Sequence, residues 1–210
     1  MNILFLCTGN ICRSPVAEVL LRQRLADLGV PARVRSAGLL RAGQPASEIG
    51  QDLLRGRGFD LSNHRSRTVT REILLGADLV LAMAREHVRE AVVAAPEAWP
   101  HTFTLKELVR RGEELGPRRE GEPFAAWLER LGAGRATSDL MGTSPGDDIA
   151  DPLAKPRSAY EALIAELEDL LDRFVLLGWG HEQTAPAGPS PAAADEGRRT
   201  GAPAPAAAPA

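Results

Sequence analysis

Short apolar runs and amphipathic stripes alternate along the first 180 residues of the chain. A run of four apolar residues follows Asn2, so residues 2–6 are predicted to form a buried strand. Beyond Pro15, apolar residues recur every three or four positions until Gly29, which predicts a helix that ends there. The same patterns predict strands at 32–37, 78–83 and 101–105 and helices at 48–57, 86–94, from 106 onward and at 158–177.

This alternation of strands and helices is typical of an α/β protein. A strand that is followed by a helix and then by another strand forms a parallel sheet with helices packed on its faces. We therefore expect a doubly wound, four-stranded parallel sheet flanked by helices on both faces. The final helix is the clearest, because Leu163, Leu167, Leu170 and Phe174 share one of its faces.

Two segments do not follow this plan. Residues 112–147 are rich in Gly, Pro, Arg and Glu and contain one short helical pattern at 124–131, so we expect a partly mobile surface insertion. Residues 181–210 are mostly Ala, Pro and Gly, and they bury too little apolar surface to offset the entropy of ordering. We expect one domain over residues 1–180, ending near Trp179, and a disordered tail.

Composition and charge exclude several classes of function. The net charge is −3, so no basic excess attracts the chain to nucleic acid or to an anionic membrane. The apolar N-terminal run is too short for a signal peptide, and no segment reaches the roughly 18 apolar residues of a membrane span. We expect a cytoplasmic protein without a membrane or nucleic-acid partner.

The chain contains two cysteines, Cys7 and Cys12, which exclude a framework of stabilising disulfides. In a reducing cytosol both are expected to be thiols. Half a zinc site is a poor explanation, because no further cysteine exists and the four histidines are scattered. We expect neither a metal nor another cofactor.

Both cysteines lie in the segment CTGNICRSP, Cys7 to Pro15, which leads from the first strand into the first helix. In open parallel sheets, ligands bind at such loops beyond the carboxyl ends of strands. Gly9 and Asn10 allow the loop to curl, so that its free N–H groups point inward and form a nest for an anion. Ser14 is a possible N-cap, with Pro15 at the first helical position.

The residues at the two ends of this loop suggest phosphoryl transfer. A helix N-terminus and a nearby arginine favour the thiolate form of a cysteine, so we expect Cys7 to be ionised at neutral pH. Arg13 can hold two phosphate oxygens in a bidentate geometry that lysine lacks. Together they allow in-line attack of sulfur on phosphorus, with the charge of the transferred group met by N–H groups and the guanidinium.

With these residues in view, the sequence resembles the low-molecular-weight protein-tyrosine phosphatases. The segment CTGNICRSP has the C-x5-R-S-P form of that family. The resemblance implies the fold of phosphotyrosine protein phosphatase I, and a phosphate bound by residues Thr8, Gly9, Asn10, Ile11, Cys12 and Arg13. It also covers the segments Ser36-Ala37-Gly38, Leu61 to Arg65, Asp78 to Met83, Phe103 to Glu107 and Asp151-Pro152.

The resemblance also assigns roles in catalysis. It implies that Asp151, which precedes a proline, is the general acid and then the general base around a phosphocysteine formed on Cys7. Ser14 is implied to hydrogen-bond the sulfur. The cluster of Asp147, Asp148 and Asp151 is also an alternative candidate for a metal site, although Asp-rich loops are more often solvated turns.

Further implied roles lie around the loop itself. The resemblance implies that Asn10, Ser36 and His64 form a buried network that holds the loop in its strained shape. It also implies a reversible disulfide between Cys12 and Cys7 that protects the nucleophile from over-oxidation.

The sequence leaves the phosphorylated substrate open. Phosphotyrosine sites usually have aromatic walls, yet Leu153 follows the Asp-Pro pair and the only tyrosine, Tyr160, lies in the last helix. The segments Cys7 to Asn10 and Phe103 to Glu107 resemble the protein-arginine phosphatase branch, in which a threonine occupies the position of Ile11. A branched apolar side chain there suits a phenyl ring and crowds a planar guanidinium, so we favour phosphotyrosine.

Two alternatives of other classes remain. An arsenate reductase of this fold would have to depend on an external thiol, since no cysteine exists beyond the loop. A module that only binds phosphate would need neither the nucleophile Cys7 nor the acid Asp151. We therefore expect a monomeric phosphatase whose partner is a phosphorylated protein.

Overall fold

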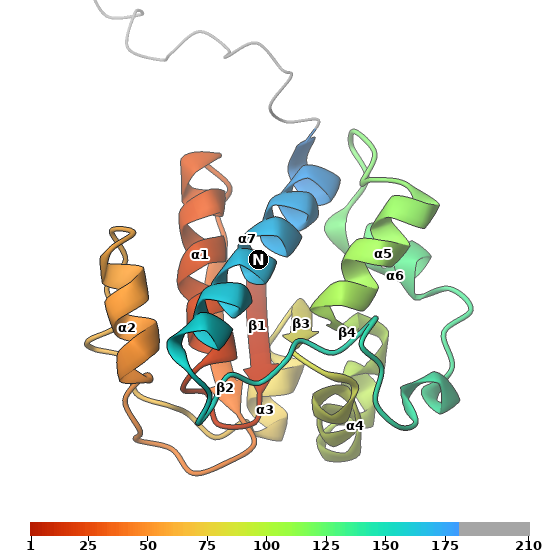
Figure 1. The fold of residues 1–210 in the computed structure, drawn as a ribbon. Helices are drawn as coiled ribbons and strands as arrows, with labels where there is room; N and C mark the ends of the chain where they lie inside the picture. The colour runs from red at the N-terminus through yellow and green to blue at the C-terminus, as the bar shows by residue number, and fades with distance from the viewer. Residues whose placement is uncertain (181–210) are drawn as a thin grey trace, which may run out of the picture.

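The computed structural model describes residues 1–180, which form a four-stranded sheet with helices on both faces (Figure 1). All strand pairs are parallel and the strand order is β2-β1-β3-β4, which confirms the predicted doubly wound sheet. The strands are β1 (Asn2–Cys7), β2 (Arg33–Gly38), β3 (Leu79–Ala82) and β4 (Thr102–Thr104). The helices are α1 (Arg13–Asp27), α2 (Glu48–Arg55), α3 (Arg71–Leu75), α4 (Arg85–Ala94), α5 (Leu105–Leu115), α6 (Phe124–Gly132) and α7 (Arg157–Trp179), with 3-10 turns at Pro96–His101 and Thr137–Leu140.

From Ile3 to Cys7 the central strand β1 is apolar, because both faces of the sheet are covered there. Ile3 and Phe5 point into a core that α1, α5 and α7 share. Leu4 and Leu6 point into the opposite core, against α3 and α4. A strand buried on both sides has no solvent-facing positions, so its sequence shows no alternation of polar residues.

Helix α1 begins earlier than the sequence predicts. Its first helical residue is Arg13, and Cys12 occupies the N-cap position without a side-chain capping bond. Ser14 is therefore not the N-cap, and Pro15 is the third helical residue, where a missing N–H still costs no helical hydrogen bond. This extra half turn places Arg13 and Ser14 in the first turn of the helix, beside the loop that precedes it.

The structure differs from the surface insertion that we predicted at 112–147. Helix α5 continues to Leu115, and α6 packs Trp127 into the core with none of its surface exposed. The Trp127 ring stacks 6.4 Å from Phe174 of α7. The segment is rich in Gly, Pro and Arg, and its few buried apolar side chains lie on α6 and at Leu140, too sparsely to give a clear sequence pattern.

Helix α7 is the longest helix and closes the described structure. It ends at Trp179, where the sequence places the end of the domain. The predicted tail at 181–210 lies outside the described residues. Within residues 1–180, no helix is long and apolar enough to cross a lipid bilayer.

Candidate active site

Residues 8–12, the phosphate loop, connect β1 to α1 at the carboxyl edge of the sheet. In the strand order, β1 lies between β2 and β3. The segments that follow β2 and β3 therefore reach the same edge and surround the loop, as expected for a ligand site in an open parallel sheet. Three segments distant in sequence build this site.

Cys7 lies at the end of β1, and 2% of its surface is exposed. The backbone N–H of Asn10 donates to Cys7 Sγ at 3.2 Å, and Ser14 Oγ lies 2.9 Å from the same sulfur. Because Ser14 Oγ accepts a hydrogen bond from Asn10 Nδ2 at 3.0 Å, its own hydrogen is free to point at the sulfur. Two hydrogen-bond donors, one backbone N–H and one hydroxyl, therefore converge on the sulfur.

A buried network fixes the shape of the phosphate loop. Asn10 has a left-handed backbone (φ 52°), which a side chain must stabilise in a residue other than glycine. Its Nδ2 donates to Ser36 Oγ at 2.8 Å, and its Oδ1 accepts from the N–H of Arg67 at 2.9 Å. His64 Nε2 lies 2.7 Å from Asn10 O. The structure thus brings together Asn10, Ser36 and His64, and it adds Arg67, which the sequence analysis missed.

Gly38 is required where β2 passes the loop. A Cβ atom at this position would lie 2.8 Å from both Thr8 O and Asn10 N, closer than side-chain carbons approach backbone atoms. The next residue, Leu39, donates its N–H to Thr8 O at 2.8 Å. The end of β2 therefore packs directly against the backbone of the phosphate loop.

Arg13 brings the loop and the candidate acid together. It is buried, with 4% of its surface exposed, and Nη2 donates to Thr8 Oγ1 at 3.1 Å and to Asp151 Oδ2 at 2.6 Å. Its Nη1 donates to Ile149 O at 3.3 Å. The other oxygen of Asp151 accepts the N–H of Leu153 at 3.1 Å. A phosphoryl group entering the loop would have to draw the guanidinium away from Asp151.

Cys12, the last residue of the phosphate loop, is buried next to the only tyrosine of the chain. Its Sγ lies 3.7 Å from Tyr160 Oη. Burial raises the pKa of Cys12, although hydrogen bonds from Tyr160 and Ser47 oppose that effect. Burial also raises the pKa of Tyr160 to about 12. Cys12 is therefore held as a neutral thiol, which is a poor nucleophile and consistent with a supporting role.

His87 contacts the loop and was missed in the sequence. It lies in the first turn of α4 and is fully buried, with Nε2 2.9 Å from Thr8 Oγ1. Its Nδ1 has no hydrogen-bond partner within residues 1–180. Its place beside the loop follows from the strand order, because α4 follows β3 and β3 neighbours β1, and the sequence analysis did not predict that order. Thr8 therefore links two side chains of the site, His87 and Arg13.

The protonation of His87 gives a prediction about acid stability. Burial, together with the positive charges of Arg13 and Arg89, lowers the pKa of His87 to about 3. An unfolded histidine binds a proton near pH ~6.5, so between that pH and pH ~3 the unfolded chain binds one proton more than the folded chain. The free energy of unfolding should therefore fall on acidification, by about 1.4 kcal/mol per pH unit from this residue.

Substituting His87→Gln should remove that contribution. Urea unfolding at pH values from 7 to 5 would measure it, and the variant should lose about 2 kcal/mol less than the wild type over this range. Parallel curves for the two proteins would contradict a neutral buried His87.

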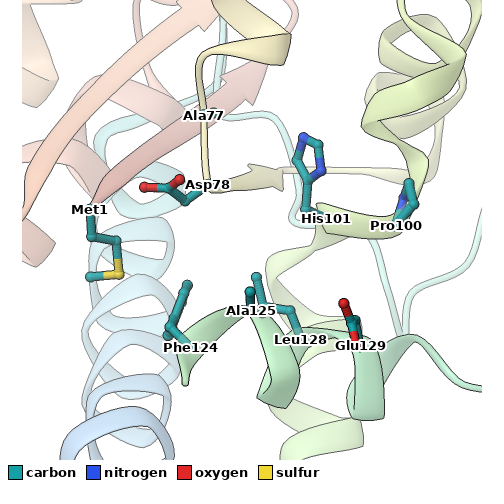
Figure 2. A pocket seen from close by; sticks show the side chains of 9 residues that line it. All are labelled: Met1, Ala77, Asp78, Pro100, His101, Phe124, Ala125, Leu128 and Glu129. Carbon is teal, nitrogen blue, oxygen red and sulfur yellow. The ribbon is translucent and has the colours of Figure 1, made fainter. Parts of the chain in front are cut away.

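A separate cavity of about 400 Å³ lies at the opposite edge of the sheet (Figure 2). Met1, Asp78 and His101 line it where β1, β3 and β4 begin, and Phe124 and Leu128 of α6 lie across from them. None of the predicted site residues lines this cavity. The predicted site residues therefore gather around the phosphate loop at the carboxyl edge rather than in this cavity.

Comparison with known proteins gives a consistent family. Residues 2–117 match the family described as low molecular weight phosphotyrosine protein phosphatase. The low molecular weight protein-tyrosine-phosphatase Etp of Escherichia coli is 36% identical over 122 residues, which are 58% of this chain and 80% of that protein. A protein-arginine-phosphatase of Geobacillus stearothermophilus is 36% identical over 174 residues, covering 82% of this chain and 93% of that protein.

Solved structures agree with the sequence comparisons. The low molecular weight protein tyrosine phosphatase of T. tengcongensis has a TM-score of 0.64 and 33% identity, covering 83% of this chain and 97% of that one. The YwlE arginine phosphatase of Geobacillus stearothermophilus has a TM-score of 0.60 and 34% identity, covering 82% of this chain and 89% of that one. Both enzymes named in these comparisons, a tyrosine phosphatase and an arginine phosphatase, share this fold.

Proposed function

This chain belongs to the low molecular weight phosphotyrosine protein phosphatase family, and we propose that it hydrolyses phosphotyrosine in proteins through a phosphocysteine on Cys7. The observation that carries the assignment of roles is the convergence of three groups at one edge of the sheet. The sulfur of Cys7 accepts from Asn10 N, and Arg13 bridges from the loop to Asp151 at 2.6 Å. A nucleophile, a cation and an acid within one small site are what phosphoryl transfer requires.

In the first step, the thiolate of Cys7 attacks phosphorus and the P–O bond to the tyrosine oxygen breaks. Asp151, protonated at this stage, gives its proton to that oxygen, so the leaving group departs as a neutral phenol. Arg13 releases Asp151 and binds two phosphoryl oxygens instead. The remaining charge is met by the N–H groups of the phosphate loop.

In the second step, water attacks the phosphocysteine and the P–S bond breaks. Asp151, now ionised, accepts a proton from the water as inorganic phosphate forms. The hydroxyl of Ser14, 2.9 Å from Cys7 Sγ, hydrogen-bonds the sulfur as it leaves with the electron pair. The cycle restores the thiolate and the protonated acid.

The rim of the site supports an aryl substrate. Leu40 donates its N–H to Thr8 O at 3.1 Å, and its surface is 58% exposed. Leu153 donates to Asp151 and is 52% exposed. Ile11 lies in the phosphate loop itself and is half-buried. Exposed leucine side chains beside the phosphate loop offer apolar contact to a phenyl ring and no hydrogen-bond acceptor to a guanidinium.

Phosphoarginine is the second candidate. The first observation in its favour is that a relative named protein-arginine-phosphatase matches along 82% of this chain and 93% of its own length. The rim also lacks the aromatic side chains that stack on a tyrosine ring. Ile11 is the feature that favours phosphotyrosine over phosphoarginine, and it can be tested directly.

Exchanging Ile11→Thr should shift the ratio of kcat/KM for phosphotyrosine over phosphoarginine peptides toward phosphoarginine by about tenfold or more. Loss of the branched apolar side chain removes contact with the ring and makes room for a polar group. The measurement is phosphate release from matched peptides by both proteins. Ile73→Thr makes the same chemical change on α3 and serves as the control.

A wild type that prefers phosphoarginine would contradict our interpretation of Ile11. An unchanged ratio in Ile11→Thr would show that this side chain does not select the substrate. Arsenate-dependent oxidation of an added thiol, without phosphatase activity, would favour the reductase alternative.

A further inference from the structure

Residues 141–151, the acid loop, carry Asp151 and are fastened by two ion pairs to the buried carboxylate of Asp147. Asp147 is 6% exposed and lies between two arginines: Arg85 Nε donates to its Oδ2 at 2.7 Å and Arg110 Nη2 to its Oδ1 at 3.0 Å. Burial alone would raise the pKa of Asp147, but the hydrogen bonds from Arg85 and Arg110 outweigh it and lower that pKa. The carboxylate thus ties the acid loop to α4 and α5.

Lys106 fastens the same loop from the first turn of α5. Its ammonium donates to Pro145 O at 3.2 Å and to Asp148 O at 2.9 Å, and it pairs with Glu166 of α7 at 2.6 Å. These three contacts use all three donors of the ammonium. Its side chain is 19% exposed. Lys106 belongs to the segment FTLKE that the sequence analysis singled out, and the catalytic cycle gives it no role.

The fastened part of the loop leads directly to the acid. Asp148 accepts the N–H of Arg85 at 2.8 Å and that of Ser144 at 2.8 Å. The next residue, Ile149, donates its N–H to Met83 O at 2.7 Å, at the end of β3. The carbonyl of Ile149 then accepts from Arg13 of the phosphate loop's helix. Only Ala150 separates this anchored residue from Asp151.

We propose that Lys106 and Asp147 are positioning residues that hold Asp151 over the phosphate loop. The proposal rests on the general-acid role proposed above for Asp151. A loop of this kind would otherwise be mobile, and a displacement of the acid by about 1 Å costs up to ~10²-fold in rate. Burying Asp147 between two arginines carries a desolvation cost that apolar residues would avoid, so stability alone does not explain it.

The leaving group distinguishes positioning from general support of the fold. An acid is needed most when the departing oxygen is basic, as in phenyl phosphate, and less for p-nitrophenyl phosphate. Lys106→Met, which keeps the length of the side chain, should lower kcat/KM for phenyl phosphate by about 10–10²-fold and for p-nitrophenyl phosphate much less. Asp147→Asn should show the same split and provides a second variant if the first does not fold.

Arg24→Met is the matched control. Arg24 also joins carbonyl groups and a carboxylate of two helices: it binds Leu20 O, Glu168 O and Asp172. It lies on α1, away from the acid loop, so its loss should produce no dependence on the leaving group. Comparable melting temperatures for the variants would show that all of them remain folded.

A double-mutant cycle completes the test. In an Asp151→Asn background, Lys106→Met should cause little further loss on phenyl phosphate, because the group that it positions is already gone. Additive losses, or equal losses on both substrates, would overturn the proposal while leaving the phosphatase function intact. A wild type inactive on both aryl phosphates would instead refute the proposed function itself.

Discussion

Replacing Cys7 by serine should lower kcat for p-nitrophenyl phosphate by at least about 10⁴-fold, as removal of a catalytic nucleophile does elsewhere. A serine hydroxyl stays protonated where a thiolate forms, and the two donors that converge on the sulfur cannot ionise it. The fold should remain intact, since serine fills the small volume at the end of β1. Phosphate release and near-ultraviolet circular dichroism would measure the two effects.

Cys12→Ser is the matched control for this experiment. It makes the same chemical change nearby, at a thiol whose sulfur lies 3.7 Å from Tyr160 Oη rather than beside Asn10 N and Ser14 Oγ. We expect its activity to stay within about tenfold of the wild type, because a neutral buried thiol does not attack phosphorus. Activity in Cys7→Ser close to that of the wild type would exclude the phosphocysteine mechanism.

The second large effect is expected for Asp151→Asn. Its kcat/KM for phenyl phosphate should fall by about 10²–10⁴-fold, the usual contribution of a general acid, and the loss on p-nitrophenyl phosphate should be smaller. The same change weakens the 2.6 Å contact with Arg13, so inorganic phosphate should inhibit the variant at lower concentrations than the wild type. Steady-state rates and phosphate inhibition constants give both results.

Asp172→Asn provides a comparison for this variant. Asp172 also pairs with an arginine, Arg24, at 2.6 Å, but far from the phosphate loop. Its loss should change neither the dependence on the leaving group nor the inhibition by phosphate. If Asp151→Asn lowers the rates of both aryl phosphates equally, another residue must protonate the leaving group.

The sequence predicts the strands and the phosphate loop because each of them is formed by a short stretch of consecutive residues. The strands β1 and β3 are short apolar runs, β2 alternates polar with small or apolar residues, and the loop from Cys7 to Arg13 carries its chemistry in consecutive residues. The residues that follow β2 and β3 then reach the loop because these two strands flank β1 in the sheet. Asp151 could be identified as the candidate acid only through the resemblance to the phosphatase family, because an Asp-Pro pair by itself is typical of many turns.

Other buried polar residues, in the site and elsewhere in the fold, depend on packing that no local sequence pattern reveals. His87 is an ordinary residue of an amphipathic helix until the neighbouring position of β3 places it against Thr8. Arg135 looks solvated in a loop rich in glycine and arginine, yet its side chain is 3% exposed and pairs with Glu107. A long charged side chain can be buried when the fold supplies a partner of opposite charge, and here that partner is distant in sequence.

The aromatic packing of α6 has a practical consequence for spectroscopy. Of the three tryptophans, Trp127 and Trp179 surround Phe124 and Phe174, and the Trp99 ring lies 4.0 Å beneath the guanidinium of Arg135. Tryptophan fluorescence therefore reports on the packing of α6 against α7. Thiol labelling monitors the loop at the other end of β1, so one sample can report on both regions independently.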